Sequence, residues 1–292
     1  MVKVSQVQAV CIIVFFVLLL GIVSLYVSIS APKHSTAQQS NRQTAKLIFS
    51  DDFNGLALNP SKWTTCYDWA ASTATGCTNF GNDESEWYLP QQVRVANGSL
   101  QLQALKQDTP GTDKLGYAKT YPYMSGMVST GKRSPNTPAK WVNTYGYYEA
   151  RMNAPAGKAI WPAFWLLPQG TEWPPEIDIM ELLGDKPDQL LHTYFWKDTQ
   201  GQQAKDSLTY TAPSDLTNEW HTYALDWQPN KITWYLDGRQ VRNITSPNVP
   251  NKKMEILLNL AVGGRLPGSP DETTPTLSTL RVDYVRVYDK KP

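Results

Sequence analysis

Hydrophobic and polar positions divide the chain into three segments. Residues 10–29 carry no charge and consist mostly of Ile, Val, Leu and Phe. A helix of about twenty such residues spans a hydrocarbon core of roughly 30 Å. A secretory signal has a shorter apolar region of about 7–15 residues, so we expect residues 1–30 to be a signal-anchor helix. A cleaved signal peptide is the alternative, because Ser28, Ser30 and Ala31 offer a cleavage site.

Either N-terminal segment places the rest of the chain outside the cytoplasm, and an uncleaved one makes the membrane a partner. Residues 31–46 (APKHSTAQQSNRQTAK) are polar and lack an apolar period, which is typical of a flexible tether. The remaining residues, 47–292, are enough for one large domain.

Short apolar segments separated by turn residues fill this domain, and no convincing helical period appears. Asn97-Gly98 and Asp237-Gly238 are typical of tight hairpin turns. Many short strands joined by such turns predict an all-β fold, an antiparallel β-sandwich of jelly-roll type. The clearest strands are expected at 93–95, 99–104, 145–152, 163–167, 220–227, 231–236, 254–260 and 280–288.

One further strand carries three acids. In PPEIDIMEL, the residues Glu176, Asp178 and Glu181 lie close together and apolar side chains fill the gaps. Burying carboxyl groups costs free energy unless each has a partner or a task. A charged edge strand with solvated acids is the alternative, and the apolar neighbours disfavour it. We therefore interpret the segment as a catalytic site.

The spacing of the three acids predicts their reaction. Side chains alternate along a strand, so Glu176 and Asp178 share a face, and Glu181 joins them only through a β-bulge. The two glutamate Cα atoms then lie roughly 13 Å apart, and side chains reaching about 4 Å inward leave roughly 5 Å between carboxyls. A retaining glycosidase has this separation. Glu176 would attack the anomeric carbon, Glu181 would protonate the leaving oxygen and then activate water, and Asp178 would hold the proton balance.

Aromatic and polar side chains near the acids are candidate sugar contacts. Trp161 and Trp165 share a strand face, and flat rings stack on the apolar faces of sugars, although core packing is the alternative. Trp173 directly precedes the acids. His192 lies on the strand expected after them, where its ring could bind sugar hydroxyls or lie satisfied in the core.

Composition and charge exclude other classes of function. The net charge is +1 and no basic stretch stands out, which argues against a nucleic acid partner. Cys66 and Cys77 form an even pair outside the apolar segment, and we expect them to close a disulfide, as in an exported protein. Motifs of zinc proteases, serine hydrolases and nucleotide-binding proteins do not occur. We expect a monomer.

Several segments closely resemble one family of enzymes. They are EIDIME, WPAFWLLP (161–168), NDESEWYLPQQV (82–93), VANGSLQLQA (95–104), YGYYEARM (145–152), WHTYALDWQPNKITWYLDG (220–238), LLNLAVGG (257–264) and VDYVRVY (282–288). Together they resemble glycoside hydrolase family 16, in its laminarinase-like, endo-1,3(4)-beta-glucanase branch. The resemblance implies a concanavalin A-like jelly roll with an open cleft. It also implies Glu176 as nucleophile, Asp178 as assisting acid and Glu181 as acid/base.

The same resemblance implies ligand contacts. Trp161 and Trp165 match positions that line the subsites near the cut, and Asn82 matches a position on the glycone side. Asp283 and the main chain near Gly98 match a structural calcium site, and oxygen ligands suit that ion. No cofactor is expected for catalysis.

These observations leave three functions to compare. The leading hypothesis is a retaining endo-acting hydrolase of β-1,3 or mixed β-1,3/1,4 glucan. A transglycosylase would pass the same covalent intermediate to a sugar hydroxyl, and a non-catalytic glycan-binding sandwich would not need the three acids. Leu266 replaces a tryptophan common in the family and Pro175 a glycine, so the exact polymer stays open.

Overall fold

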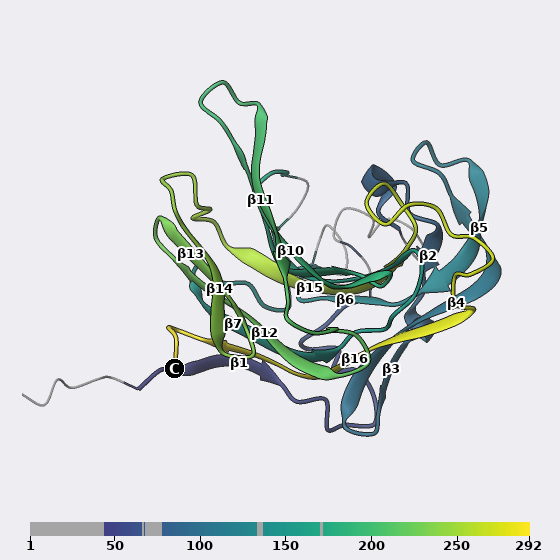
Figure 1. Ribbon diagram of the computed structural model, residues 1–292, viewed down its shortest axis with the longest axis horizontal. Coiled ribbons are helices and arrows are strands. Elements are labelled where there is room, and N and C mark those ends of the chain that lie inside the picture. Colours follow the sequence, from purple (N-terminus) through teal and green to yellow (C-terminus); the bar gives the residue numbers. More distant parts are fainter. Residues whose placement is uncertain (1–43, 66, 68–77, 133–136, 170–171) are drawn as a thin grey trace, which may run out of the picture. The chain divides into compact units, whose positions relative to one another are not determined.

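Two β-sheets packed face to face form the domain (Figure 1). The structure, a computed structural model, describes residues 44–65, 67, 78–132, 137–169 and 172–292, all within one compact unit, Gln43–Pro292. Among the named strands of these residues, β2 and β5 pair in parallel and every other pair is antiparallel. The predicted all-β sandwich is confirmed.

The larger sheet has ten strands. Its order is β14-β13-β12-β7-β16-β4-β5-β2, with β1 paired to β16 and β3 paired to β4. The strands are β1 (Leu47–Asp51), β2 (Glu86–Tyr88), β3 (Val93–Ala96), β4 (Ser99–Thr112), β5 (Ala118–Ser125), β7 (Gly146–Asn153), β12 (Trp220–Gln228), β13 (Lys231–Leu236), β14 (Arg239–Thr245) and β16 (Leu277–Tyr288).

The smaller sheet has six strands in the order β11-β10-β9-β8-β15-β6. They are β6 (Met127–Ser129), β8 (Ile160–Pro168), β9 (Glu176–Leu183), β10 (Lys186–Lys197), β11 (Gln203–Thr211) and β15 (Met254–Val262). Two short 3-10 turns, η2 (Phe80–Asn82) and η3 (Pro90–Gln92), are the only helical elements in the described ranges.

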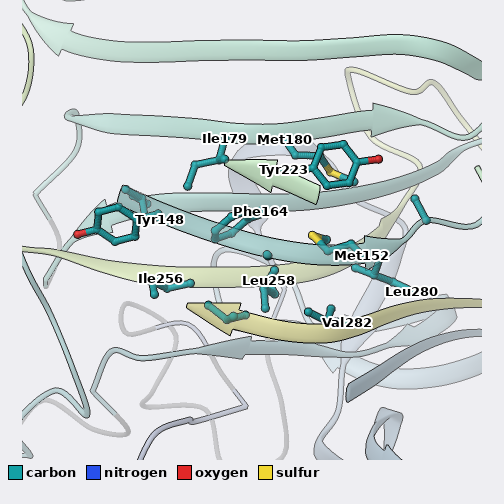
Figure 2. Close-up of a cluster of buried hydrophobic side chains, with 14 of the residues drawn as sticks. Tyr148, Met152, Phe164, Ile179, Met180, Tyr223, Ile256, Leu258, Leu280 and Val282 are labelled. Carbon is teal, nitrogen blue, oxygen red and sulfur yellow. The ribbon is translucent and has the colours of Figure 1, made fainter. Parts of the chain in front are cut away.

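The core lies between the two sheets. Figure 2 shows Phe164, Ile179 and Met180 of the smaller sheet packed among side chains of the larger sheet, such as Tyr148 and Met152. Apolar burial of this kind contributes roughly 25 cal/mol for each Å² removed from water, so this layer is the main source of stability.

The tryptophans of β12 and β13 separate into two groups. Trp227 and Trp234 are fully buried. Trp220 is 36% exposed, and the Arg151 guanidinium lies 5.0 Å from its ring centroid. Its position at the start of β12, where the strand emerges from the core, explains the difference.

Both predicted hairpin turns are confirmed. Asn97 and Gly98 join β3 to β4, and Asp237 and Gly238 join β13 to β14, all four with positive φ. Two-residue hairpin turns of this kind favour Asn-Gly and Asp-Gly because both central residues need positive φ.

Several predictions concern parts of the chain outside the described residues. They are the apolar helix at residues 10–29, most of the tether, and the disulfide between Cys66 and Cys77. Within the described ranges, no helix has the length and hydropathy needed to cross a membrane.

Candidate active site

A β-bulge in β9 brings the three acids to one face of the smaller sheet. Against β8, Met180 pairs with Phe164 and Asp178 with the next residue, so one residue of β9 is extra. Against β10, Glu181 and Asp178 pair with Leu191 and Thr193, which again leaves one extra residue. The predicted bulge between Asp178 and Glu181 is therefore confirmed.

The bulge changes which side chains are buried in the core. Ile179 and Met180, although adjacent in sequence, both lie in the hydrophobic core (Figure 2). Glu176, Asp178 and Glu181 all line a cavity of about 800 Å³ on the other face. Without the extra residue, Glu181 would point into the apolar core.

The cavity contains most of the predicted contacts. Its other lining residues include Trp161, Trp165, Trp173 and Asn82, which the sequence marks as sugar contacts. Trp161 and Trp165 come from β8, directly beside the acids of β9, whereas Asn82 comes from η2. The structure therefore brings together residues that are far apart in the sequence.

Two tryptophans hydrogen-bond the outer acids. Trp173 Nε1 donates to Glu176 Oε2 at 2.7 Å, and Trp161 Nε1 donates to Glu181 Oε1 at 3.2 Å. Trp173 is 45% exposed, so its ring is also open to a ligand, and it contacts Phe195. Trp161 is nearly buried; it lines the cavity wall and its indole N–H is directed at the Glu181 carboxyl.

Burial and mutual repulsion give the acids different protonation states. Burial raises the pKa of Glu176 to about 7, although hydrogen bonds from Trp173 and Asp178 oppose the rise. Burial and the charge of Glu176 raise the pKa of Glu181 to about 8, opposed by Trp161 and Lys205. Burial is the largest of the effects that raise the pKa of Asp178 well above its usual range, and the charges of Glu176 and Glu181 raise it further. Asp178 therefore keeps its proton and donates it in a hydrogen bond to Glu176.

His192 does not belong to the cavity, which corrects its predicted role in sugar binding. Its ring is fully buried and stacks on Trp234 of the opposite sheet, with centroids 5.7 Å apart. Burial, together with the charge of Arg242, lowers the pKa of His192 to about 3, so the ring is neutral. Residues 191 and 193 of β10 pair with the acids, and alternation therefore turns residue 192 towards the core.

The predicted calcium residues lie on the larger sheet. Asp283 of β16 accepts a hydrogen bond from Arg151 at 2.7 Å, and Gly98 lies in the β3–β4 turn. In the described part of the chain, no group of three or more acidic, histidine or cysteine side chains could hold a metal ion.

Other cavity residues carried no strong signal in the sequence. Glu84, Asn259 and Lys205 line the cavity together with Phe195 and Arg265. Lys205 lies on β11, whose hairpin with β10 projects beyond the sheets in Figure 1. Its positive charge lowers the pKa of both Asp178 and Glu181. Among these residues, only Glu84 carries a signal in the sequence: in NDESEWY it lies two residues before a second acid, Glu86.

Acidic side chains with different protonation states that line one cavity are typical of a glycoside hydrolase. Comparison with known proteins agrees. Residues 82–286 match the sequence profile of Glycosyl hydrolases family 16. The chain belongs to this family, and the predicted laminarinase-like branch is confirmed.

Relatives and solved structures cover most of the chain. Endo-1,3-1,4-beta-glycanase EglC of Rhizobium meliloti is 32% identical over 266 residues, which are 85% of this chain and 52% of that protein. The Beta-glucanase of Rhodothermus marinus is 32% identical over 273 residues, 83% of this chain and 85% of that protein. The structure of endo-beta-1,3-glucanase from Pyrococcus furiosus matches with a TM-score of 0.68 and 34% identity, covering 85% of this chain and 95% of that one. The chain spans about half the length of the first two curated relatives it matches.

Proposed function

We propose that the chain is a retaining, endo-acting hydrolase of β-1,3 or mixed β-1,3/1,4 glucan. The bulge in β9 is the observation that carries this proposal, because it turns Glu181 into the cavity beside Glu176 and Asp178. A sandwich that only bound glycans would have no need of three buried, mutually repelling acids, which destabilise the fold.

The first step is attack on the anomeric carbon. Glu176, ionised and held by Trp173, forms a bond from its carboxylate oxygen to that carbon, while the glycosidic C–O bond breaks. Glu181 transfers its proton to the leaving oxygen, and its raised pKa keeps that proton available near neutral pH. The hydrogen bond from Asp178 favours the ionised state of Glu176.

The second step releases the sugar. Glu181, now ionised, takes a proton from water as the water oxygen attacks the anomeric carbon and the bond to Glu176 breaks. Two inversions at one carbon give net retention. If a sugar hydroxyl replaces water, the same step becomes transglycosylation, and products longer than the starting oligosaccharide would identify it.

The substrate proposal rests on the relatives and on the cleft. The relatives include an endo-1,3-1,4-beta-glycanase, a glucan endo-1,3-beta-glucosidase and a beta-glucanase. The cavity is open and mixes aromatic walls, Trp165 and Trp173, with amide and charged groups. Such a surface suits a neutral sugar chain, which presents both C–H faces and hydroxyl groups.

Glu176→Gln tests the mechanism. Turnover of laminarin and mixed-linkage glucan, measured as reducing ends, should fall by about 10⁴-fold or more, while the variant still binds oligosaccharides. Glu172→Gln is the matched control, since Glu172 also lines the cavity but is exposed and paired with Lys252. Full activity in Glu176→Gln, or no cleavage of either glucan by the unsubstituted chain, would refute the proposal. The anomer formed first, followed by NMR, tests retention.

We also propose a structural calcium site at Asp283 and the main chain near Gly98. Val282 pairs with Leu100, so the register places Asp283 beside the β3–β4 turn. The Asp283 carboxylate and main-chain oxygens near Gly98 are ligands of the type that calcium prefers, although Arg151 would have to release the carboxylate. Added Ca²⁺ should raise the melting temperature of the EDTA-treated chain, and not that of Asp283→Asn. An equal effect in both would exclude this site.

We infer an extracytoplasmic domain, anchored by residues 10–29, from the apolar composition of that segment. The mature N-terminus, determined on protein from the producing cell, distinguishes an uncleaved anchor from a cleaved signal peptide. A start near Ala31 would mean secretion after cleavage.

A further inference from the structure

A second pair of acids is buried beside the cavity, away from β9. Glu84 is 4% exposed and lines the cavity, and Glu86, the first residue of β2, is fully buried behind it. The two carboxyls are hydrogen-bonded to each other. Among the described residues, no lysine, arginine or histidine forms an ion pair with either.

Two adjacent buried carboxyls without a counter-ion cannot both be ionised, because each charge raises the cost of the other. The hydrogen bond between them therefore needs one proton. Apart from Glu84, Glu86 has three hydrogen-bond donors around it: the backbone N–H of Val262 at 2.8 Å, its own backbone N–H, and the Thr78 hydroxyl at the longer distance of 3.4 Å. Burial and the charge of Glu84 raise the pKa of Glu86 well above its usual range.

Glu84 also accepts three hydrogen bonds from groups other than its partner, and two of them come from side chains at distances of 3.3 Å or less. Asn82 Nδ2 donates to Oε1 at 3.1 Å, and the Tyr88 hydroxyl donates to Oε2 at 3.3 Å. The backbone N–H of Asn79 and the Glu86 carboxyl add two more hydrogen bonds. An ionised carboxylate accepts about four hydrogen bonds and donates none, so these four donors fill its capacity.

The network continues from Glu84 to the aromatic wall of the cleft. The Tyr88 hydroxyl accepts a hydrogen bond from Asn259 Nδ2 at 3.0 Å, and Asn259 Oδ1 accepts one from Trp165 Nε1 at 2.8 Å. Asn82, Asn259 and Trp165 all line the cavity. The orientation of both amide groups and of the indole therefore depends on Glu84 acting only as an acceptor.

We propose that Glu84 and Glu86 share one proton, held on Glu86, and that together they are positioning residues for the sugar-binding wall formed by Asn82, Asn259 and Trp165. The inference rests on the proposed function for the identity of the ligand, a neutral glucan chain. The pair acts on binding of the sugar rather than on bond cleavage, because none of its hydrogen bonds reaches Glu176, Asp178 or Glu181.

The test compares the same chemical change at the two positions. Glu86→Gln keeps a donor towards Glu84 and an acceptor for Val262, so KM for laminari-oligosaccharides should stay within about twofold. Glu84→Gln replaces one of the two acceptor oxygens by an NH2 group that faces hydrogen-bond donors, and KM should rise about tenfold or more while kcat changes less than about threefold. Glu86→Met, which removes the donor, should resemble Glu84→Gln.

A second readout requires no substrate. The indole N–H resonance of Trp165 in a ¹⁵N NMR spectrum should shift in Glu84→Gln and in Tyr88→Phe, and remain in place in Glu86→Gln. Tyr88→Phe keeps the ring and removes only the hydroxyl link, so it covers the case in which Glu84→Gln fails to fold.

Opposite results would overturn the inference. One is an equal rise of KM in Glu84→Gln and Glu86→Gln. The others are a loss of kcat at unchanged KM in Glu84→Gln, and an unmoved Trp165 resonance in Tyr88→Phe. Failure of the unsubstituted chain to cleave glucan would instead refute the proposed function, and the resonance would still report on the network.

Discussion

The hydrogen bond from Trp161 to the acid/base Glu181 allows a quantitative test of how this carboxyl is tuned. Trp161→Phe keeps an aromatic ring on β8 and removes the Nε1–H, which lies 3.2 Å from Glu181 Oε1. A hydrogen bond to an ionised group contributes about 1.5–3 kcal/mol, and this long one belongs at the lower end. Since about 1.4 kcal/mol corresponds to one pKa unit, the change should be about one unit.

The sign follows from the state that the bond stabilises. Trp161 donates to the ionised carboxylate and lowers the pKa of Glu181, which burial raises to about 8. Removing the donor raises this pKa further. Because Glu181 must be protonated to act as the acid, the alkaline limb of kcat/KM should move from about pH 8 to higher pH.

The assay is the pH dependence of kcat/KM on a soluble laminari-oligosaccharide. Trp165→Phe is the matched control, because it is the same substitution on the same strand but its Nε1–H serves Asn259. Lost sugar contacts lower the whole profile in both variants, whereas only Trp161→Phe should displace the alkaline limb. An unmoved limb, a shift to lower pH, or equal shifts in the two variants would refute the reasoning.

Three further predictions concern the same acids. Trp173→Phe removes a 2.7 Å donor to Glu176, so the acid limb of kcat/KM, expected near pH 7, should move to higher pH; an unchanged limb would contradict this. Asp178→Asn keeps a donor towards Glu176 and should retain more activity than Asp178→Leu, measured as kcat on laminarin; equal losses would argue against that hydrogen bond. Glu181→Gln should stabilise the fold at pH 8 more than at pH 5. The folded chain keeps the Glu181 proton that the unfolded chain releases above its ordinary pKa, so the wild type loses stability as pH rises towards 8. Equal gains in melting temperature at both pH values would contradict the raised pKa.

The sequence predicts strands best where one or both faces are buried. β8 and β15 are buried along their whole length, and β12 is buried over residues 223–227, so each leaves a clear apolar pattern. β11 leaves none, because nearly all its side chains are exposed. It is a strand only because it pairs with β10 along its full length, which is a contact between segments rather than a local preference.

The bulge and the three acids were determined by the sequence alone. Strand alternation is a local rule, so the spacing of Glu176, Asp178 and Glu181 was enough to show that the three acids can share one face only through an extra residue before Glu181.

Only the tertiary structure decided which further side chains join the acids. His192 seemed placed to contact sugar, yet pairing with β9 turns it into the core against Trp234. Glu84 lies far from the acids in sequence and reaches the same cavity because the two sheets pack together. Its role depends on donors from η2, β2 and β15. Hydrogen bonds between distant segments, and the protonation states that they impose, depend on distances that no local pattern encodes.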